Sequence, residues 1–487
     1  MAGRTIVVVG GGITGLSAAL RLRDELGPQA RITVVDQADR LGGKLHTRPF
    51  HGGYAEAGAE TFLTGDPAAV RLAERVGLGE ALRHPEPVPA ALAVDGHLRP
   101  IPRGTLMGVP ADPATVADLA PVTGTDRDEG HPVLAPGADV SVGELVRARL
   151  GVPVLDRLVD PLLGGVYAGR GDDLSLAATV PALAAACRTE STLTGAVRSA
   201  LARRVSGGGP VFATVDGGLG RLVDAVAAAS GARVRLGAPV RALARDGYAW
   251  RVSVGGEVLD ADAVVLAVPA RPAARLLTGV APGAAAEVGA LDYASVALVV
   301  LAVPARPAAR LLTGVAPGAA AEIGALDYAS VALVTLAVRG ARLPELSGFL
   351  VPASEGYAVK ALTIFTTKWA HLARPDGLAV LRASVGRYGD VAVLHRSDEE
   401  LAGLVHAELG RLLGHPLPEP ERTRVTRWGG ALPQYAPGHL DRVGRARAEL
   451  VDMQGIAVAG AAYDGVGVPA CVRSGWAAAQ RILDSVA

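Results

Sequence analysis

Cysteine is almost absent from this sequence, which contains only Cys187 and Cys471. Two cysteines exclude the disulfide framework of a small secreted protein and are too few for a cysteine-built metal site. We expect both to be small buried residues in a reducing compartment, and no metal-binding residue is assigned.

Long apolar segments are also missing. The longest candidate, 293–305, contains Pro304 and is shorter than the ~18 residues that a membrane span requires, so any membrane contact is expected to be peripheral. The stretch from Arg4 to Leu20 has the polarity of a secretory signal peptide. Its three consecutive glycines and the lack of a small-residue cleavage site argue against one, and we expect a cytoplasmic protein.

Neither sign of charge is in excess. The chain has 48 basic and 48 acidic residues and a formal net charge of zero, so nothing indicates a nucleic-acid partner. Lysine itself is rare, at Lys44, Lys360 and Lys368 only, whereas arginine is abundant. This bias is typical of GC-rich coding, and the three lysines are singled out by scarcity alone. The 487 residues leave room for two to four domains.

The first 47 residues contain the most informative pattern. The apolar run 5–9 predicts a strand that leads directly into Gly10-Gly11-Gly12. Apolar residues at helical spacing predict a helix over 16–26, and 32–35 predicts a second strand that ends on Asp36. This order is that of a dinucleotide-binding βαβ unit, a more specific signal than a glycine motif alone.

Each part of this unit has a role if a dinucleotide binds. Gly10 makes the tight turn, Gly12 lets the backbone approach a pyrophosphate, and Gly15 lets the helix pack close to the strand. The helix N-terminus offers free N–H groups to the phosphates. Asp36 can accept hydrogen bonds from both ribose hydroxyls. The alternative, a glycine-rich loop that binds nothing, is less favoured.

The strand and helix pattern is interrupted in the middle of the chain. A hairpin is predicted around Asp95-Gly96, and 142–202 is mostly helical after a capping box of Ser141 and Glu144. Strand and helix signals resume at Phe212. The nucleotide domain is therefore predicted to be split in sequence, with an inserted domain between its pieces.

A near-perfect repeat follows. Residues 265–299 recur as 300–334, and Val288 against Ile323 is the only difference. Solenoid repeats diverge and usually number three or more, so this pair indicates a recent tandem duplication or an error in the recorded sequence. Two nearly identical segments cannot fill one place in a fold. We predict that one copy packs outside the shared core.

The C-terminal residues predict a second glycine-rich helix start. A strand over 456–460, a loop over 465–469 and a helix over 470–483 follow one another. A helix N-terminus in this position stabilises negative charge. NAD enzymes seldom need that, whereas a flavin gains negative charge at its N1–C2=O edge on reduction. FAD is therefore the predicted cofactor.

Four stretches resemble the FAD-dependent amine oxidase superfamily. They are Gly10-x-Gly12-x-x-Gly15 with Asp36, Arg40-x-Gly42-Gly43-Lys44, Asp216-Gly217-Gly218 with Val240, and the segment 460–474. The superfamily more often has Glu in place of Asp36 and Arg in place of Lys44. The resemblance implies an α/β fold, in which a discontinuous Rossmann-like FAD-binding domain of the amine-oxidase type carries an inserted α+β substrate-binding domain and a helical subdomain. The implied domains are 1–84, 205–270 and 425–487 for FAD, and 85–204 and 271–424 for the substrate.

Within the superfamily, the chain resembles the protoporphyrinogen and coproporphyrinogen oxidases of haem synthesis over nearly its whole length, one repeat copy excepted. The stretches that carry this resemblance are Gly58-Ala59-Glu60-Thr61-Phe62, Val166-Tyr167-Ala168-Gly169, Thr367-Lys368-Trp369, Pro433-Gln434-Tyr435 with Gly438-His439, and Asp464-Gly465-Val466-Gly467. Ala59-Glu60 stands where Pro-Asn or Pro-Asp is usual, which bears on flavin placement. Arg170 stands where an acid often follows the glycine, which bears on substrate contacts.

The resemblance implies a six-electron oxidation of a porphyrinogen in three two-electron steps. FAD, held non-covalently, accepts a hydride, and dioxygen reoxidises it to give hydrogen peroxide. No side chain is assigned a catalytic role, because such chemistry needs geometry and an apolar slot more than an acid or base. Similarity to the enzymes of Gram-positive bacteria favours coproporphyrinogen III as the substrate, and a transient contact with a ferrochelatase is a further implied partner.

The resemblance also implies two sets of site residues. The cofactor-binding set is Gly10, Gly12, Ile13, Thr14, Gly15, Asp36, Gln37, Arg40, Gly42, Gly43, Lys44, Gly58, Ala59, Glu60, Thr61, Val240, Gly460, Val466, Gly467 and Val468. Because the substrate carries propionates, arginine or lysine should line the mouth of its slot. The substrate candidates are Gly169, Arg170, Lys360, Lys368 and Arg387.

Three alternatives stay open on sequence alone. Protoporphyrinogen IX, with two propionates instead of four, is not distinguished from coproporphyrinogen III. Another flavin oxidase of the same fold could act on amines or carotenoid precursors, although the aromatic pair typical of amine oxidases is not evident in a chain with 4% aromatic residues. A flavin-free escort-type binding protein is the third alternative, and the complete FAD stretches at both ends argue against it.

Overall fold

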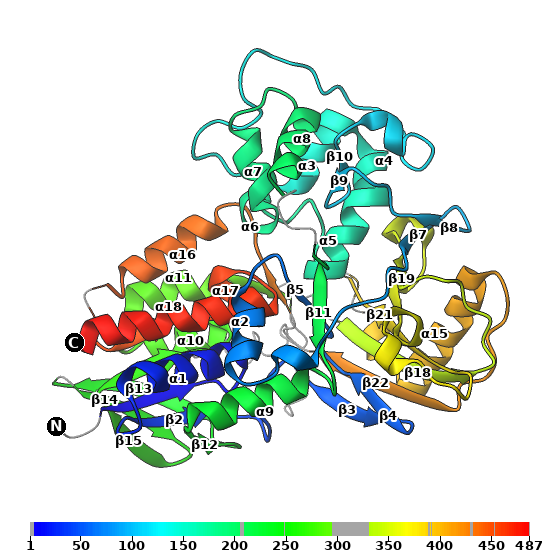
Figure 1. The fold of residues 1–487 in the computed structure, drawn as a ribbon. Coiled ribbons are helices and arrows are strands. Elements are labelled where there is room, and N and C mark those ends of the chain that lie inside the picture. The colour runs from blue at the N-terminus through cyan, green and yellow to red at the C-terminus, as the bar shows by residue number, and fades with distance from the viewer. Residues whose placement is uncertain are drawn as a thin grey trace, which may run out of the picture.

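The computed structural model describes most of the chain. The described residues are 4–204, 209–247, 249–294, 331–387, 390, 392–428, 432–451 and 453–486. Figure 1 shows three parts: a sheet with its helices at the lower left, a larger sheet at the right, and a helical part at the top.

A five-stranded parallel sheet forms the first part. Its strands, in spatial order, are β12 (Arg233–Arg235), β2 (Arg31–Val35), β1 (Thr5–Val9), β16 (Ala263–Leu266) and β24 (Ile456–Val458). Because successive side chains of a strand point to opposite faces, Ile6 and Val8 pack into one core and Val7 and Val9 into another. Burial on both faces explains the continuous apolar runs from which these strands were predicted.

Helices cover one face of this sheet and a mixed layer covers the other. The first layer contains α1 (Ile13–Leu26), α2 (Ala68–Arg75), α9 (Leu219–Ser230) and α18 (Val468–Val486). The second contains the antiparallel strands β13 (Val240–Asp246), β14 (Ala249–Val254) and β15 (Glu257–Ala261), with α10 (Ala270–Leu277), α11 (Pro282–Gly289) and α16 (His439–Ala448). Figure 1 shows α18, from the C-terminal end, beside α1.

Two small sheets and a short helix adjoin this part. The hairpin of β3 (Thr47–Phe50) and β4 (Gly53–Glu56) follows the second glycine pair, and β11 (Phe212–Val215) pairs with both β5 (Phe62–Leu63) and β6 (Leu82–Arg83). The four-residue α17 (Ala461–Asp464) follows β24. These connections bring 44–60 beside the C-terminal glycine loop. Residues of both segments line one cavity, which is described below.

The larger sheet has seven strands. In spatial order they are β22 (Arg422–Trp428), β18 (Val331–Arg339), β21 (Leu378–Val385), β20 (Val359–Ile364), β19 (Gly348–Leu350), β7 (Ala90–Val94) and β8 (His97–Pro100). Helix α15 (Asp398–Leu413) packs on one face and starts at a capping box of Ser397 and Glu400. The hairpin predicted at Asp95-Gly96 is confirmed as β7 and β8. Strand β20 ends at Ile364, where α14 (Phe365–Lys368) begins.

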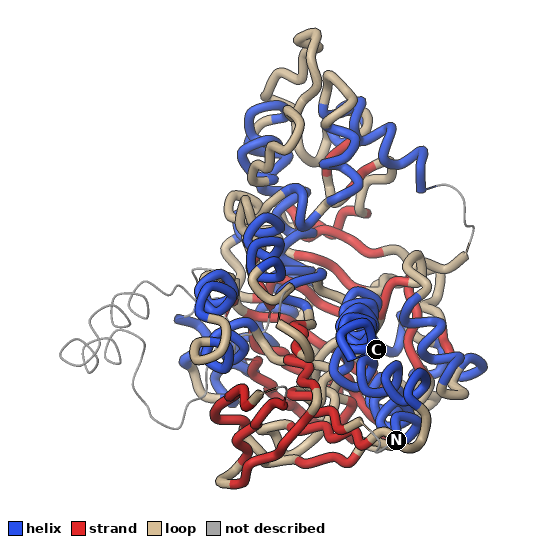
Figure 2. The backbone as a smooth tube through the Cα atoms, turned by 90° about the vertical axis from the view of Figure 1, so that its left-hand side faces the viewer, coloured by secondary structure: helices blue, strands red, loops and turns tan. Residues whose placement is uncertain are grey.

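The helical part lies between β10 (Val109–Pro110) and β11 in the sequence. Its main helices are α3 (Val142–Leu150), α5 (Asp160–Tyr167), α6 (Leu176–Thr179), α7 (Pro181–Cys187) and α8 (Leu193–Arg204). The predicted cap is confirmed, because the Ser141 hydroxyl accepts a hydrogen bond from the Glu144 N–H at 3.0 Å. Figure 2 shows these helices at one end of the molecule, away from the strand-rich base. Within the described ranges, no helix combines the length and apolarity needed to cross a bilayer.

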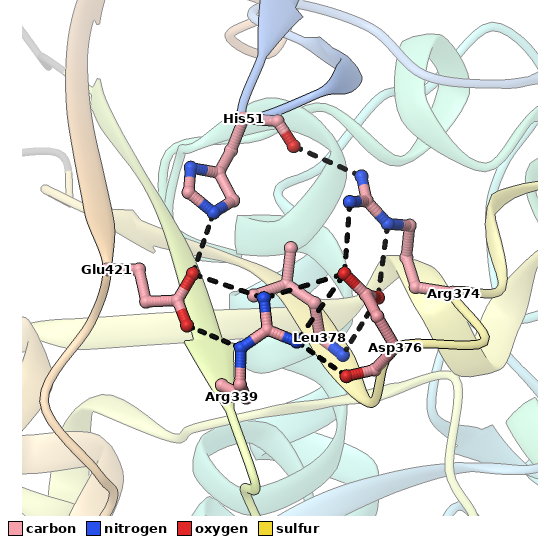
Figure 3. A network of polar contacts seen from close by, with 6 residues as sticks. All are labelled: His51, Arg339, Arg374, Asp376, Leu378 and Glu421. Atoms are coloured by element: carbon pink, nitrogen blue, oxygen red, sulfur yellow. Dashed lines mark hydrogen bonds and ion pairs between the residues drawn. The ribbon is translucent and has the colours of Figure 1, made fainter.

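Exposed ion pairs tie the β3–β4 hairpin to the larger sheet (Figure 3). His51, in the hairpin turn, contacts Glu421 at 2.8 Å, and Glu421 also accepts from the Arg339 guanidinium at 2.6 Å. Arg374 completes the link by donating to the His51 carbonyl and pairing with Asp376. The hairpin therefore adjoins the part built on the five-stranded sheet and also contacts the seven-stranded sheet.

The duplicated sequence contributes to both large parts. The first copy supplies the end of β16, α10, α11 and β17 (Asp292–Ala294), and the end of the second copy supplies Val331 to Val334 of β18. The prediction that one copy packs outside the core concerns 295–330, and these residues lie outside the described ones.

Candidate functional site

One cavity collects most of the residues expected to bind a cofactor. We call it the nucleotide cavity; it has a volume of about 330 Å³ and is formed by the ends of β1 and β2, the start of α1, the second glycine pair and the loop before α18. The expected residues that line it are Gly10, Gly12, Ile13, Thr14, Asp36, Gln37, Gly42, Gly43, Lys44, Ala59, Val240, Gly460, Val466, Gly467 and Val468. Segments from both ends of the chain thus meet in one place.

The three motif glycines have separate steric roles. Gly10 has φ +111°, and a Cβ there would lie 2.2 Å from the Ala267 carbonyl oxygen. Gly15 does not line the cavity; a Cβ there would lie 2.0 Å from the Gly10 carbonyl oxygen, so α1 can approach β1 only with glycine at this position. A Cβ on Gly12 would have no protein atom within 4 Å. Gly12 therefore leaves open space where a ligand can approach the backbone.

The N-terminus of α1 is free to bind an anion. Gly12 supplies no side-chain cap, and the first turn contains no acidic residue. The N–H groups of the first turn therefore have no partner within the helix, and Ile13 and Thr14 place this end of α1 on the cavity wall. A helix start of this kind favours phosphate.

Asp36 ends β2 and lies on the same wall. Its Oδ2 accepts a hydrogen bond from the Gly11 N–H at 2.6 Å, and its Oδ1 accepts from the Ala38 N–H at 2.8 Å. A carboxylate oxygen accepts more than one hydrogen bond, so both oxygens retain capacity for ribose hydroxyls. The backbone bonds fix the carboxylate in place.

Arg40 and Gly58 do not line the cavity. They hold or permit the backbone conformation of segments that do. The Arg40 guanidinium donates to the carbonyls of Leu41 at 3.0 Å and Gly43 at 2.7 Å, which holds the second glycine turn. A Cβ on Gly58 would lie 1.9 Å from the Lys44 carbonyl oxygen, so the 58–60 segment can lie against Lys44 only with glycine here. Thr61 has no described contact that assigns it to the cavity.

Lys44 and Cys471 face each other in the nucleotide cavity. Burial lowers the pKa of the Lys44 ammonium, and burial raises the pKa of the Cys471 thiol, which also accepts a hydrogen bond from the Thr14 side chain. Within the described part of the chain, Lys44 has no ion pair. Its charge therefore lacks a protein counterion at the end of the cavity where α1 begins.

Glu60 is held by two cations, Lys368 of α14 and Arg382 of β21. Its carboxylate is paired with Lys368 and, at 2.6 Å, with Arg382, and Arg382 also donates to the carbonyls of Glu56 and Gly58. Burial alone would raise the pKa of Glu60, but Lys368 and Arg382 outweigh burial and hold that pKa below its ordinary value. The Glu60 side chain thus anchors the 56–60 segment, while its neighbour Ala59 lines the nucleotide cavity.

A second cavity, of about 720 Å³, brings together four of the five substrate candidates: Gly169, Arg170, Lys360 and Arg387. We call it the Lys360 cavity. It lies between α5 with the following loop, β20 with the turn before it, and α15. Its volume falls within the usual range for small-molecule sites. Lys368 is not part of it, because this lysine pairs with Glu60.

Strand β23 (Leu432–Gln434) connects the two cavities. Leu432 lines the nucleotide cavity, and two residues later the buried Gln434 lies against Gly169, which lines the Lys360 cavity. A Cβ on Gly169 would lie 2.1 Å from Gln434 Oε1. Gln434 Nε2 donates to the Tyr167 carbonyl at 2.8 Å. A side chain at Gly169, the glycine that ends Val166-Tyr167-Ala168-Gly169, would therefore have to displace the Gln434 amide.

Sequence reasoning missed three residues of these sites. Arg382 was not anticipated, since no local pattern in β21 connects it to 56–60. Cys471 lies inside the last helix as expected, but it was expected to be buried, whereas it is only partly buried and lines the nucleotide cavity. The buried carboxylate of Glu408 lines the Lys360 cavity and accepts from the N–H groups of Ala358 and Val359; its place on the buried stripe of α15 gave no sign of this.

Comparisons with known proteins agree with this geometry. The sequence profile of flavin containing amine oxidoreductases matches residues 13–483. A coproporphyrinogen III oxidase from Mycobacterium tuberculosis is 37% identical over 100% of this chain and 99% of its own length, and one from Bacillus subtilis is 30% identical over 98% and 97%. The crystal structure of a provisionally assigned protoporphyrinogen oxidase from Exiguobacterium sp. 255-15 is 31% identical, with a TM-score of 0.79 and 99% of both chains covered.

The family match and the structural similarity confirm the amine-oxidase flavoenzyme fold that the four sequence stretches predicted. The identities of 30% and more over nearly the full length confirm the narrower resemblance as well. The chain therefore belongs to the flavin-containing amine oxidoreductase family, in the branch formed by the porphyrinogen oxidases.

Proposed function

We propose that this chain is an FAD-dependent enzyme of haem synthesis that oxidises coproporphyrinogen III to coproporphyrin III. Removal of six electrons and six protons with three molecules of dioxygen gives three molecules of hydrogen peroxide. The observation that carries the proposal is the Lys360 cavity beside the nucleotide cavity. Arg170, Lys360, Arg387 and Arg396 line it together with four protein carboxylates, and the buried Lys360, which has no ion pair in the described part of the chain, can pair with a carboxylate of the substrate. The relatives from Mycobacterium tuberculosis and Bacillus subtilis bear the name of this activity.

The nucleotide cavity fits FAD. The N-terminal N–H groups of α1 and the Lys44 side chain suit the pyrophosphate, and Asp36 suits the ribose. Val240, which also lines the cavity, would contact adenine through its backbone. The loop before α18, with Val466 and Gly467, would hold the flavin end. When bound, FAD supplies a two-electron acceptor for each step of the oxidation, and dioxygen restores it.

We further propose that FAD is held without a covalent bond. Cys471 contacts Thr14 at the start of α1, the end of the cavity assigned to phosphate, and burial raises the pKa of its thiol. A protonated thiol is a poor nucleophile. Cys187 is buried among the helices of the other part. Neither cysteine is placed to react with the flavin ring.

The proposed binding of cofactor and substrate is divided between the parts of the structure that contain the two large sheets. The segments 1–84, 205–270 and 425–487 would bind FAD, and 85–204 with 271–424 would bind the porphyrinogen, although α10 and α11 pack on the FAD side. Of the substrate candidates, Lys368 has the role of neutralising Glu60. Gly169 and Gln434 would set the distance between the two ligands. Transient handover of the product to a ferrochelatase completes the proposal.

Protoporphyrinogen IX is the second candidate substrate, favoured by the name of the similar Exiguobacterium protein. Its two carboxylates would leave more of the cationic side chains of the Lys360 cavity without a partner. We therefore expect coproporphyrinogen III to be oxidised with the higher kcat/KM.

The test is oxidation of both porphyrinogens by the purified chain, followed by porphyrin fluorescence, with flavin absorption recorded first. Acid precipitation should release all of the flavin into the supernatant. A preference for protoporphyrinogen IX would favour the second candidate. A colourless protein that cannot take up FAD would instead point to a binding protein without oxidase activity, and flavin retained in the acid pellet would contradict non-covalent binding.

A further inference from the structure

Lys360 carries a buried amine that forms no ion pair with any residue that the structure describes. Its side chain, on β20, is only 7% exposed and borders the Lys360 cavity. Within the described ranges, the only hydrogen bond of its Nζ is a long one, 3.4 Å, to the Gly164 carbonyl of α5. The charge that most affects it is that of Arg387, which has the same sign. Such an amine lacks the counterion that a buried cation normally has.

The neighbouring charged groups are engaged elsewhere. Arg387 donates to the carbonyls of Tyr357, Val351 and Val359, and Glu408 accepts from two backbone N–H groups. Asp160, on α5, accepts from the Gly171 N–H at 2.7 Å, and burial raises its pKa to about 6. The ionisable groups that line the cavity from all packed elements are Asp156, Asp160, Arg170, Tyr357, Arg387, Asp390, Arg396 and Glu408. None of these carboxylates forms an ion pair with Lys360 in the described part of the chain.

Burial of an amine favours its neutral form. Burial first, and the charge of Arg387 second, lower the pKa of Lys360 to about 7. Without a ligand, the Lys360 side chain is therefore mainly uncharged above pH 7. A carboxylate placed beside it would supply the missing counterion and restore the charged form.

We propose that Lys360 binds one carboxylate of the substrate and takes up a proton as it does so, so that binding and protonation form one coupled step. This inference rests on the proposed function, since it takes the Lys360 cavity as the porphyrinogen site. The proton goes from solvent to Nζ, and the ion pair forms between Nζ and the carboxylate. Affinity for the tetracarboxylate therefore decreases as the pH rises through the titration range of Lys360.

The probe is coproporphyrin III, the product, titrated into the purified flavoprotein from pH 6 to pH 9 by porphyrin fluorescence. We expect Kd to be nearly constant below pH 7 and to rise about tenfold for each pH unit above it. Calorimetry at pH 8 in two buffers of different ionisation enthalpy should show the uptake of about one proton for each bound porphyrin. The carboxylates of the free ligand titrate below this pH range.

Three variants separate Lys360 from its neighbours. Lys360→Arg should bind with little pH dependence and no proton uptake, because guanidinium stays charged throughout. Lys360→Met should bind more weakly and equally at all pH values, and Asp160→Asn should retain the slope of the parent chain. Flavin absorption of each variant checks that it folds.

Three results would overturn the inference. Binding by the parent chain without pH dependence or proton uptake would refute coupling and leave the proposed function intact. A pH slope that persists in Lys360→Met would also refute the role of Lys360 and leave the proposed function intact. No binding at any pH, together with no oxidation of coproporphyrinogen III, would refute the proposed function and this inference with it.

Discussion

At the scale of single residues, Glu60 shows how the chain tolerates a departure from its family pattern. The usual Pro-Asn or Pro-Asp is replaced by Ala59-Glu60, which removes the rigidity of proline. In its place, Lys368 and Arg382 hold the Glu60 carboxylate, and Arg382 also binds two carbonyls of the same segment. A buried ion cluster therefore fixes the backbone beside the nucleotide cavity.

Glu60→Gln should destabilise the protein strongly, because it leaves two cations near a buried site without their anion. We expect the free energy of unfolding in urea to fall by about 3 kcal/mol. The matched control is Glu421→Gln, which breaks the exposed pair with Arg339 shown in Figure 3 and should change stability little. Addition of Lys368→Met to Glu60→Gln should recover part of the loss. Equal effects of the Glu60 and Glu421 variants would show that the buried cluster is not structural.

At the scale of elements, the start of α9 is held by the β3–β4 hairpin. Asp216-Gly217-Gly218 opens this helix, but none of the three residues lines the nucleotide cavity. The Leu219 N–H donates to Glu56 Oε1 at 2.6 Å, and the Gly220 N–H donates to the Thr47 hydroxyl at 2.8 Å. The first N–H groups of α9 are thus bound by side chains of the hairpin, whereas no described side chain caps the start of α1.

Glu56 makes this contact sensitive to pH. Burial raises its pKa to about 7, so the folded protein binds a proton more tightly than the unfolded chain does. Stability from this group is therefore present at low pH and is lost as the pH rises from about 4.5 to about 7, by about 3 kcal/mol in total. Glu56→Gln keeps the acceptor oxygen and removes the titration.

Urea unfolding of both proteins at pH 5 and pH 8 measures this effect. The variant should gain stability relative to the parent chain on going to pH 8 and should show little difference at pH 5. A constant difference between the two proteins at both pH values would contradict the assignment to Glu56.

Local patterns predicted elements well and long-range partners poorly. The opening unit was predictable because Gly10, Gly12 and Gly15 act on their immediate neighbours in sequence. The capping of α9 was not, since Glu56 lies 163 residues from Leu219. The pairing of Lys368 with a residue 308 positions away was equally invisible, and the sequence therefore suggested substrate binding for this lysine.

At the scale of the whole molecule, the strand pairings indicate that one repeat unit is sufficient. Ala294 of β17 pairs with Leu432, and Val331 of β18 pairs with Trp428, four residues earlier on the opposite strand. If 35 residues of one copy are not counted, Val331 follows Ala294 by two positions. The ends of the two ladders would then be separated by one residue on one side and three on the other.

Removal of 35 residues, with Ser295 joined directly to Val331, should therefore leave a folded protein that binds flavin. Deleting either copy gives the same sequence except for Val288 or Ile323, so two single-copy chains serve as controls for each other. Both should match the parent chain in flavin content, and their unfolding free energies should differ from it by no more than about 1 kcal/mol. Loss of flavin or of cooperative unfolding in both would show that the second copy belongs to the core.

The lining of the nucleotide cavity runs from Val9 to Cys471, almost the full length of the chain. A ribosome makes these residues in order, so the wall formed by α18 is the last to emerge, after β1, α1 and β2 have long been available. Loading of the cofactor is therefore a step that follows translation, and nascent or prematurely terminated chains would expose the glycine turns without being able to retain a flavin.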